Sequence, residues 1–156
     1  MKTIIGLFVV LFIVAFAVIF FQSKNPSFKS PFAKNPTVSI NKHAFSVVIA
    51  KSAKETEIGL SEKTSLPQDS GMLFIFNNPD YYSFWMKNMK FSIDIIFINK
   101  DRVVAVFTDA PIPKSKDEYL PIYKPDEPAD EVLEINAGLS KKYNIKKGDQ
   151  VKFENI

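Results

Sequence analysis

The sequence contains no cysteine, and only one histidine and one tryptophan occur among its 156 residues. Without cysteine the chain forms no disulfide bond, offers no thiol nucleophile and cannot be acylated in the manner of a lipoprotein. A metal site built from cysteine and histidine is excluded for the same reason, and the acidic residues do not have calcium-loop spacing. We therefore predict neither a bound metal nor a cofactor.

Catalytic patterns are also scarce. The single histidine, His43, would need an acid and a nucleophile from distant parts of the chain to form a site of the Ser-His-Asp type. The five glycines are spread over the whole chain, so neither a phosphate-binding loop nor a dinucleotide-binding pattern is present. These absences argue against an enzyme, although they do not exclude one.

Acidic residues are missing from residues 1 to 54, which carry seven lysines. Residues 55 to 156 hold the other 13 basic residues and all 17 acidic residues, a net charge of −4. An acidic folded part without a basic stripe argues against nucleic-acid binding. The lysines of residues 1 to 54 are compatible with a solvated linker. They are also compatible with binding to an anionic lipid surface, which stabilises each nearby lysine by about 1 kcal/mol.

A long apolar run, from Ile4 to Phe21, carries no charged residue. As a helix it would extend about 27 Å, close to the thickness of the hydrocarbon core of a bilayer. It ends in bulky Phe20 and Phe21, whereas a cleaved signal peptide has a shorter apolar region and small residues at its cleavage site. We therefore expect residues 1–21 to form an uncleaved transmembrane anchor.

Two signals for the orientation of this anchor disagree. The lysines after the run favour a cytoplasmic location for the region that follows, whereas the short basic start is typical of an export signal. We expect a single-pass membrane protein whose domain lies outside the cytoplasm. Residues 22–36, which contain Pro26, Pro31 and Pro36, are predicted to be a linker.

Residues 37–156 have the size of one domain. Alternating apolar and polar residues predict a hairpin from Val38–Ile40 and Phe45–Ile49, with its turn near Asn41 and Lys42. Ser52 and Glu55 form a capping-box pattern, so the one helix is predicted over 52–60. A turn is expected from Leu66 to Gly71, and further strands are expected at 72–76, 82–86, 93–98, 103–108, 132–135 and 151–153.

The strand at 93–98 is apolar on both faces, which predicts a central strand covered on both sides. Asn99, Lys100 and Asp101 then predict a turn into the strand at 103–108. The expected fold is mainly β (α+β): a compact antiparallel β barrel or sandwich-like domain of about eight strands and one short helix. Between Asp109 and Asp130 lie five prolines, which indicates a long loop of functional interest.

Trp85, Lys87 and Asn88 are the main ligand-binding candidates. In an extended segment Trp85 and Lys87 share one face, while Phe84 and Met86 share the opposite, core-like face. Trp85 offers a flat surface for stacking a sugar ring, and Lys87 and Asn88 offer hydrogen-bond donors beside it. The structural alternative is that Trp85 packs under a loop, Lys87 pairs with Asp94 and Asn88 holds a turn.

Asp94 is the fourth candidate, because a carboxylate inside an apolar strand needs an ion-pair or hydrogen-bond partner. Lys87 or the amides of the preceding turn are the expected partners. The functional alternative is a general acid or base, which makes Asp94 a weak catalytic candidate. Glu134 lies on the same face of a short strand as Val132. It also needs a partner or a functional role, although the requirement is weaker than for Asp94.

Several short motifs occur in a fixed order along the chain: GL at 59–60, LP at 66–67, GMLF at 71–74, FWMKN at 84–88, DIIFI at 94–98, AG at 137–138 and GD at 148–149. Taken together, they resemble the domain of unknown function 192 family over about residues 38–153. The chain departs from the family pattern at Ser61, Lys63, Met89 and in the triplet Ser92, Ile93 and Asp94. The resemblance implies a compact, mainly β domain with a short helix, and many relatives carry export signals. It implies no reaction, cofactor or catalytic residue.

Three functions remain open at this point. The first is a tethered, non-enzymatic module that binds a glycan or another cell-envelope component through Trp85, Lys87 and Asn88, with the proline-rich loop as a flap. The second is an envelope hydrolase that uses Asp94. The third is an interaction or assembly domain in which the loop from Asp109 to Asp130 binds a protein partner.

Overall fold

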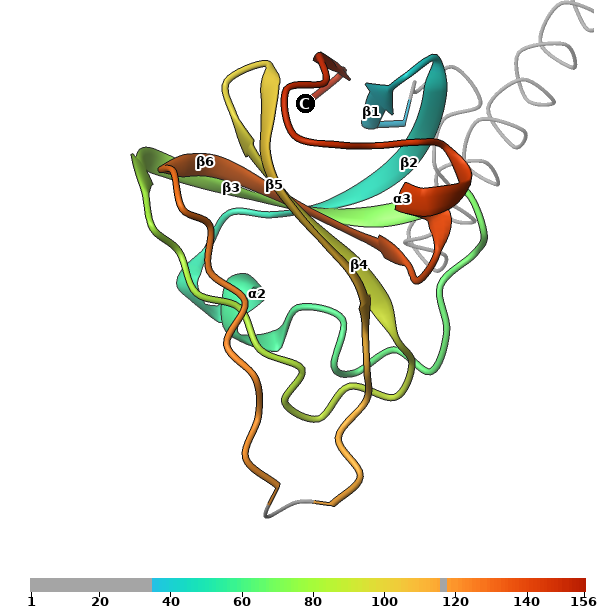
Figure 1. Cartoon of the computed structure of the whole chain (residues 1–156), viewed down its shortest axis with the longest axis vertical. Coiled ribbons are helices and arrows are strands. Elements are labelled where there is room, and N and C mark those ends of the chain that lie inside the picture. The colour runs from blue at the N-terminus through green and yellow to red at the C-terminus, as the bar shows by residue number, and fades with distance from the viewer. Residues whose placement is uncertain (1–34, 116–117) are drawn as a thin grey trace, which may run out of the picture. The chain divides into compact units, whose positions relative to one another are not determined.

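The computed structural model of the chain describes residues 35–115 and 118–156, and residues 35–156 form one compact unit (Figure 1). The anchor expected at 1–21 and nearly all of the linker expected at 22–36 lie outside the described residues. Within the described ranges no helix is long and apolar enough to cross a membrane.

The first hairpin and the first helix follow the local sequence signals. Strands β1 (Thr37–Ile40) and β2 (His43–Ala50) pair antiparallel, and the turn residues Asn41 and Lys42 both have positive φ angles, of 51° and 66°. Such a turn matches the twist of the two strands. Helix α2 (Ala53–Ile58) begins with the predicted capping box of Ser52 and Glu55.

Strand β3 (Ser70–Asp80) pairs with β2 in parallel, so the prediction of an entirely antiparallel sheet is wrong at this pair. The chain from α2 to residue 69 returns to the start of the sheet before β3 begins, and such a crossover permits parallel pairing. Gly71, predicted to end a turn, lies inside β3 opposite Ile135. A Cβ atom there would lie 2.8 Å from the backbone oxygen of Glu134, so the close approach of the strands requires glycine.

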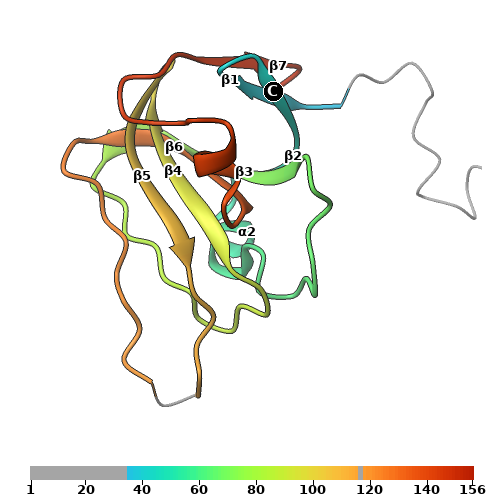
Figure 2. The same cartoon turned by 45° about the vertical axis from the view of Figure 1, so that its right-hand side comes forward.

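The remaining strands complete a seven-stranded sheet in the order β5-β4-β6-β3-β2-β1-β7. Its outer strands meet at one end, where the Val103 N–H donates to the Asp149 oxygen at 2.9 Å and the Val151 N–H donates to the Asp101 oxygen at 2.7 Å. The sheet is thus a strongly curled half-barrel (Figures 1 and 2). These elements are β4 (Ile93–Asn99), β5 (Arg102–Ala110), β6 (Ala129–Asn136), α3 (Leu139–Lys142) and β7 (Val151–Glu154).

Two predictions about the elements are wrong in detail. The described residues contain seven strands rather than about eight, because segment 82–86 is not a strand. Only Phe84 in this segment forms a β-bridge, with Tyr123. A second short helix, α3, was not predicted, since its four residues LSKK carry no periodic pattern that could be read.

Two hydrophobic cores lie on opposite faces of the sheet. Ile96 and Ile98 of β4 belong to the core inside the curl, with residues of β1, β5, β6, β7 and α3. Ile93, Ile95 and Phe97 belong to the outer core, with Met72 and Phe74 of β3 and the segments outside the sheet. The prediction that β4 is covered on both faces is therefore confirmed.

Candidate functional site

The segment from Tyr81 to Ser92 crosses the outer core and alternates between buried and exposed side chains. Met86 is 1% exposed, whereas Trp85 is 57% exposed. The predicted division into an inward face with Phe84 and Met86 and an outward face with Trp85 and Lys87 is confirmed. Because Trp85 is exposed, the alternative that it packs under a loop is wrong.

Two contacts hold this segment in place. Phe84 and Tyr123 exchange two backbone hydrogen bonds of 2.9 Å, which tie the segment to the end of the proline-rich loop. Asn88 has a φ angle of 62°, and the Met89 N–H donates to the Met86 oxygen at 3.2 Å across the turn. Asn88 therefore does hold a turn, as the structural alternative predicted.

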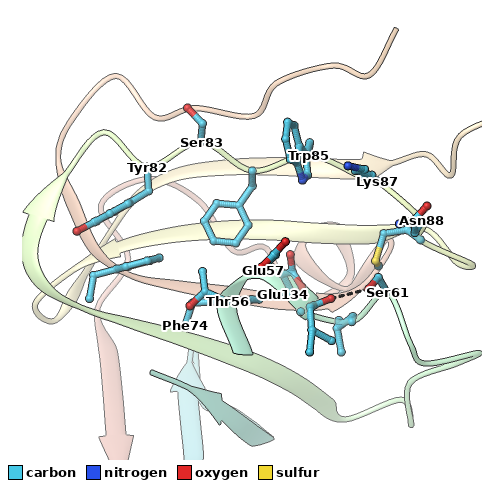
Figure 3. Close-up of a pocket in the computed structure, with 16 residues that line it drawn as sticks. Thr56, Glu57, Ser61, Phe74, Tyr82, Ser83, Trp85, Lys87, Asn88 and Glu134 are labelled. Carbon is cyan, nitrogen blue, oxygen red and sulfur yellow. Dashed lines mark hydrogen bonds between the residues drawn. The ribbon is translucent and has the colours of Figure 1, made fainter. Parts of the chain in front are cut away.

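A cavity of about 340 Å³ lies between this segment and helix α2. Figure 3 shows Trp85, Lys87 and Asn88 along one side of the cavity and Thr56, Glu57 and Glu134 across from them. Three of the four predicted site residues therefore share one cavity. The complete lining is residues 56–61 from α2 and the turn after it, Phe74 and Phe76 from β3, Tyr82–Trp85 and Lys87–Met89 from the crossing segment, and Glu134 from β6.

Aromatic rings form much of the cavity wall. Phe76 and Tyr82 are stacked with their centroids 3.6 Å apart, and Phe84 meets Phe74 edge to face at 5.0 Å. The Lys87 ammonium group lies 5.6 Å from the centroid of the Trp85 ring, in cation–π contact. These contacts hold the inner rings against one another, while the Trp85 side chain stays more than half exposed.

Glu134 is the functional candidate that sequence reasoning underrated. Its side chain is only 6% exposed, and its Oε2 atom has no hydrogen-bond partner among the described residues. Burial raises the pKa of the Glu134 carboxyl from its ordinary value of 4.5 to about 8. A protonated carboxyl group at neutral pH therefore lines the cavity. The signal in the sequence was an acid at a core-facing position of an apolar strand, but nothing local distinguished a cavity from a structural ion pair.

A second acidic side chain, Glu57, and its neighbour Thr56 reach the cavity from α2. Glu57 is exposed, unlike Glu134. A second hollow of about 570 Å³ adjoins the first and shares Thr56, Glu57, Phe76 and Tyr82 with it. Asn77 and Asn78 line the far part of this second hollow. The stacked rings of Phe76 and Tyr82 therefore border both hollows.

Asp94 lies on the opposite face of the sheet and does not join the other candidates. It is fully buried, and its Oδ1 atom accepts hydrogen bonds from the backbone N–H groups of Asp109 at 2.8 Å and Gly138 at 3.0 Å. Its Oδ2 atom accepts one from the Ser140 N–H at 2.7 Å. The buried carboxylate therefore connects β4 to β5 and to the start of α3. The predicted partner Lys87 lies over Trp85 instead, and the amides come from distant segments rather than from the preceding turn.

His43 lies in a separate cluster. Its Nε2 atom is 3.2 Å from the Asp69 Oδ1 atom, and its ring stacks on Tyr143 with the centroids 3.5 Å apart. These contacts connect the first hairpin to the turn before β3 and to the end of α3. None of the three residues lines the cavity.

The proline-rich loop between β5 and β6 extends from 111 to 128. Its residue Tyr123 packs against Phe107 with centroids 5.5 Å apart, which anchors the end of the loop next to the crossing segment. Ile112, Tyr119 and Ile122 of this loop are exposed, Tyr119 to 88%. The loop therefore borders the segment that carries Trp85, and its role as a flap or as a partner site stays a prediction.

The solved structures that are similar to this chain include the following two. A protein of unknown function from Novosphingobium aromaticivorans is 34% identical, with a TM-score of 0.64, and the match covers 78% of this chain and 89% of that one. A protein from Sinorhizobium meliloti described as a putative transcription regulator is 28% identical, with a TM-score of 0.68, and the match covers 80% and 97%. Comparison with curated proteins gives no match.

The family comparison agrees with the motifs found in the sequence. The model of domain of unknown function 192 (DUF192), described as "Uncharacterized ACR", matches residues 36–153. This range includes strands β1 to β6, all but the last residue of β7, the helices α2 and α3, and every residue that lines the cavity. The chain belongs to the domain of unknown function 192 family.

Proposed function

We propose that this protein is a non-enzymatic binding module that takes one sugar unit of a glycan or cell-envelope component in the cavity beneath Trp85. The observation that carries the proposal is the position of an exposed tryptophan at the mouth of a cavity that also contains polar groups. Aromatic faces stack on the apolar faces of sugar rings, while amide, hydroxyl and ammonium groups pair with the ring hydroxyls.

The size and lining of the cavity support a small ligand. Its volume of about 340 Å³ lies at the lower end of the range of roughly 300–1,000 Å³ for small-molecule sites. Aromatic side chains form much of its wall, and its polar lining residues include Thr56, Lys87, Asn88 and Glu134. Such a composition is typical of sites that bind rather than of a surface that packs against another protein.

The location that we propose follows from the sequence. Residues 1–21 would hold the protein in a membrane as a single-pass anchor, with the domain outside the cytoplasm, where envelope glycans occur. We propose no nucleic-acid partner, although one structural relative is described as a putative transcription regulator. The reason is the net charge of −4 over residues 55–156.

The test uses the single tryptophan of the chain, Trp85, as the reporter. The full-length protein, kept in a zwitterionic detergent without a sugar head group, is titrated with soluble glycan fragments while tryptophan fluorescence is recorded. The proposal expects a saturable change in intensity or emission wavelength. If every fragment leaves the emission unchanged up to its solubility limit, the proposal is wrong.

One observation favours a second candidate, hydrolysis of a glycosidic bond. The Glu134 carboxyl, whose pKa is raised to about 8, keeps its proton at neutral pH, and Glu57 supplies another carboxyl group in the same cavity. A pair of carboxyl groups in one site, one of which acts as the general acid, is the usual arrangement for glycoside cleavage. Incubation of the protein with a glycan, followed by chromatography of the products, would detect cleavage. A cleavage that survives Glu134→Gln would exclude Glu134 as the acid.

A further inference from the structure

The chemical character of the cavity near Glu134 limits the kinds of ligand group that can bind there. One oxygen of the Glu134 carboxyl group, Oε2, is buried and has no hydrogen-bond partner among the described residues, and part of the cavity lining consists of apolar side chains. Leu60 is 2% exposed and Phe74 is 1% exposed, while Phe84 and Met89 are partly buried against the same core. A ligand group that enters here must satisfy a carboxyl group and also tolerate apolar neighbours.

We propose that the cavity binds the acetamido group of an N-acetylated amino sugar, an inference that rests on the proposed function and names its ligand class. The amide N–H of the acetamido group would donate a hydrogen bond to Glu134, and the amide oxygen would accept one from a donor of the cavity. The methyl group would pack among Leu60, Phe84 and Met89. The sugar ring would then lie toward Trp85 at the mouth.

Other ligand groups fit this part of the cavity less well. A hydroxyl group has no apolar part to place against Phe84 and Met89, and burying further hydroxyls there without partners is costly. An ammonium group would have to displace the proton that burial keeps on Glu134, whose pKa is raised to about 8. Trp85 already has a cation nearby, the ammonium group of Lys87. An acetamido group is uncharged, and it needs only one acceptor, Glu134, and one donor of the cavity.

The adjoining hollow offers space for a ligand longer than one sugar unit. The adjoining hollow shares Thr56, Glu57, Phe76 and Tyr82 with the first cavity, so a second sugar unit bound to the first would lie over these residues and near Asn77 and Asn78. The amide side chains of these asparagines can both donate and accept hydrogen bonds. A disaccharide of N-acetylglucosamine should therefore bind more tightly than the monosaccharide.

The experiment compares three sugars that differ only at one ring position: N-acetylglucosamine, glucosamine and glucose. Each is titrated into the full-length chain with Trp85 fluorescence as the readout. N-Acetylglucosamine should bind about tenfold more tightly than glucose, the ratio expected from one well-formed hydrogen bond and a buried methyl group. Equal binding of glucose overturns the acetamido inference but leaves the proposed function intact. Tightest binding of glucosamine overturns it in favour of a cation site, and no binding of any sugar overturns both.

Variants test the role of Glu134 itself. Glu134→Leu should bind the three sugars without preference, while Glu134→Gln, which still offers a donor and an acceptor, should keep part of the preference. Glu131→Gln is the matched control, because Glu131 lies on the same strand but on the other face, and its pKa is also raised to about 8 by burial and by neighbouring Asp130. The control should keep the full preference. If Glu134→Leu folds and keeps it too, the inference is wrong.

Discussion

Glu134 and Trp85 line the same cavity, one as a buried carboxyl group on β6 and the other as an exposed indole on the crossing segment. The sheet holds Glu134 rigidly, because β6 pairs with β3 on one side and with β4 on the other. The crossing segment is held by the backbone pairing of Phe84 with Tyr123. A preformed position for each group lowers the entropic cost of binding a ligand between them.

Replacing Trp85 should separate binding from stability. Trp85→Ala is expected to abolish sugar binding, measured by calorimetry because the fluorescent reporter is lost. It should change the free energy of unfolding by only about 0.5 kcal/mol, since the side chain is more than half exposed. The adjacent Met86 is the control: it is 1% exposed, and Met86→Ala should cost about 2–5 kcal/mol. A Trp85→Ala protein as unstable as the Met86→Ala protein would place Trp85 in the core.

The buried carboxyl of Glu134 should make stability depend on pH. Its pKa is about 8 in the folded protein and about 4.5 when unfolded, so the folded state holds the extra proton between these values. The free energy of unfolding should therefore fall as the pH rises from about 4.5 to about 8 and then level off. At about 1.4 kcal/mol for each tenfold change in the acid dissociation constant, the fall is on the order of a few kcal/mol.

Denaturant titrations at several pH values measure this effect. Glu134→Gln should remove the part of the fall in the free energy of unfolding that comes from Glu134. The free energy of unfolding of the variant minus that of the wild type should therefore grow as the pH rises. Glu131→Gln removes a separate part in the same pH range, because the pKa of Glu131 is also raised to about 8. A difference between wild type and Glu134→Gln that stays constant from pH 5 to pH 8 would show that Glu134 ionises normally.

Asp94 should behave as a structural residue. Asp94→Asn replaces one acceptor oxygen by an N–H group, which faces one of three backbone donors, those of Asp109, Gly138 and Ser140. The loss of a buried charged acceptor should destabilise the protein by about 1–3 kcal/mol or more. Hydrogen exchange should speed up at the amides of Gly138 and Ser140 in particular. Loss of an activity with unchanged stability and exchange would instead assign Asp94 to chemistry.

Gly71 should be intolerant of any side chain. A methyl group there would approach the Glu134 backbone oxygen to 2.8 Å and the Leu133 Cδ1 atom to 3.0 Å, so β3 and β6 would have to separate. Gly71→Ala should cost about 1–3 kcal/mol by thermal unfolding and should also weaken ligand binding, because it displaces the strand that carries Glu134. Gly148→Ala is the comparison: its new methyl group has open space, so only the backbone strain at φ 93° opposes it. A harmless Gly71→Ala would contradict this packing.

Local signals in the sequence predicted several elements well. The turn at Asn41 and Lys42, the capping box of Ser52 with Glu55, and the apolar run of β4 each depend on residues close together in the chain. The alternation from Tyr82 to Met86 was also local, and it predicted the inward and outward faces correctly. It did not predict the absence of a strand, because a strand needs a partner and only Phe84 has one, Tyr123.

Contacts between segments that lie far apart in the chain could not be predicted from the sequence. The parallel pairing of β2 with β3 depends on the path of the chain after α2, and the burial of Asp94 is satisfied by amides from β5 and from the start of α3. The cavity likewise combines residues from α2, β3, β6 and the crossing segment. For this reason Trp85, Lys87 and Asn88 were found as neighbours in the chain, whereas the importance of Glu134 and Glu57 required the fold.

The most direct test maps the binding surface by two-dimensional NMR of the full-length, isotope-labelled chain with and without the disaccharide of N-acetylglucosamine. The account predicts that the largest changes occur at the Trp85 indole N–H, at Asn88, in residues 56–61 and at the Glu134 amide. Residues around His43 and Asp94 should change little. Shifts confined to the loop 111–128 or to the His43 cluster, with none at Trp85 or Glu134, would contradict the account.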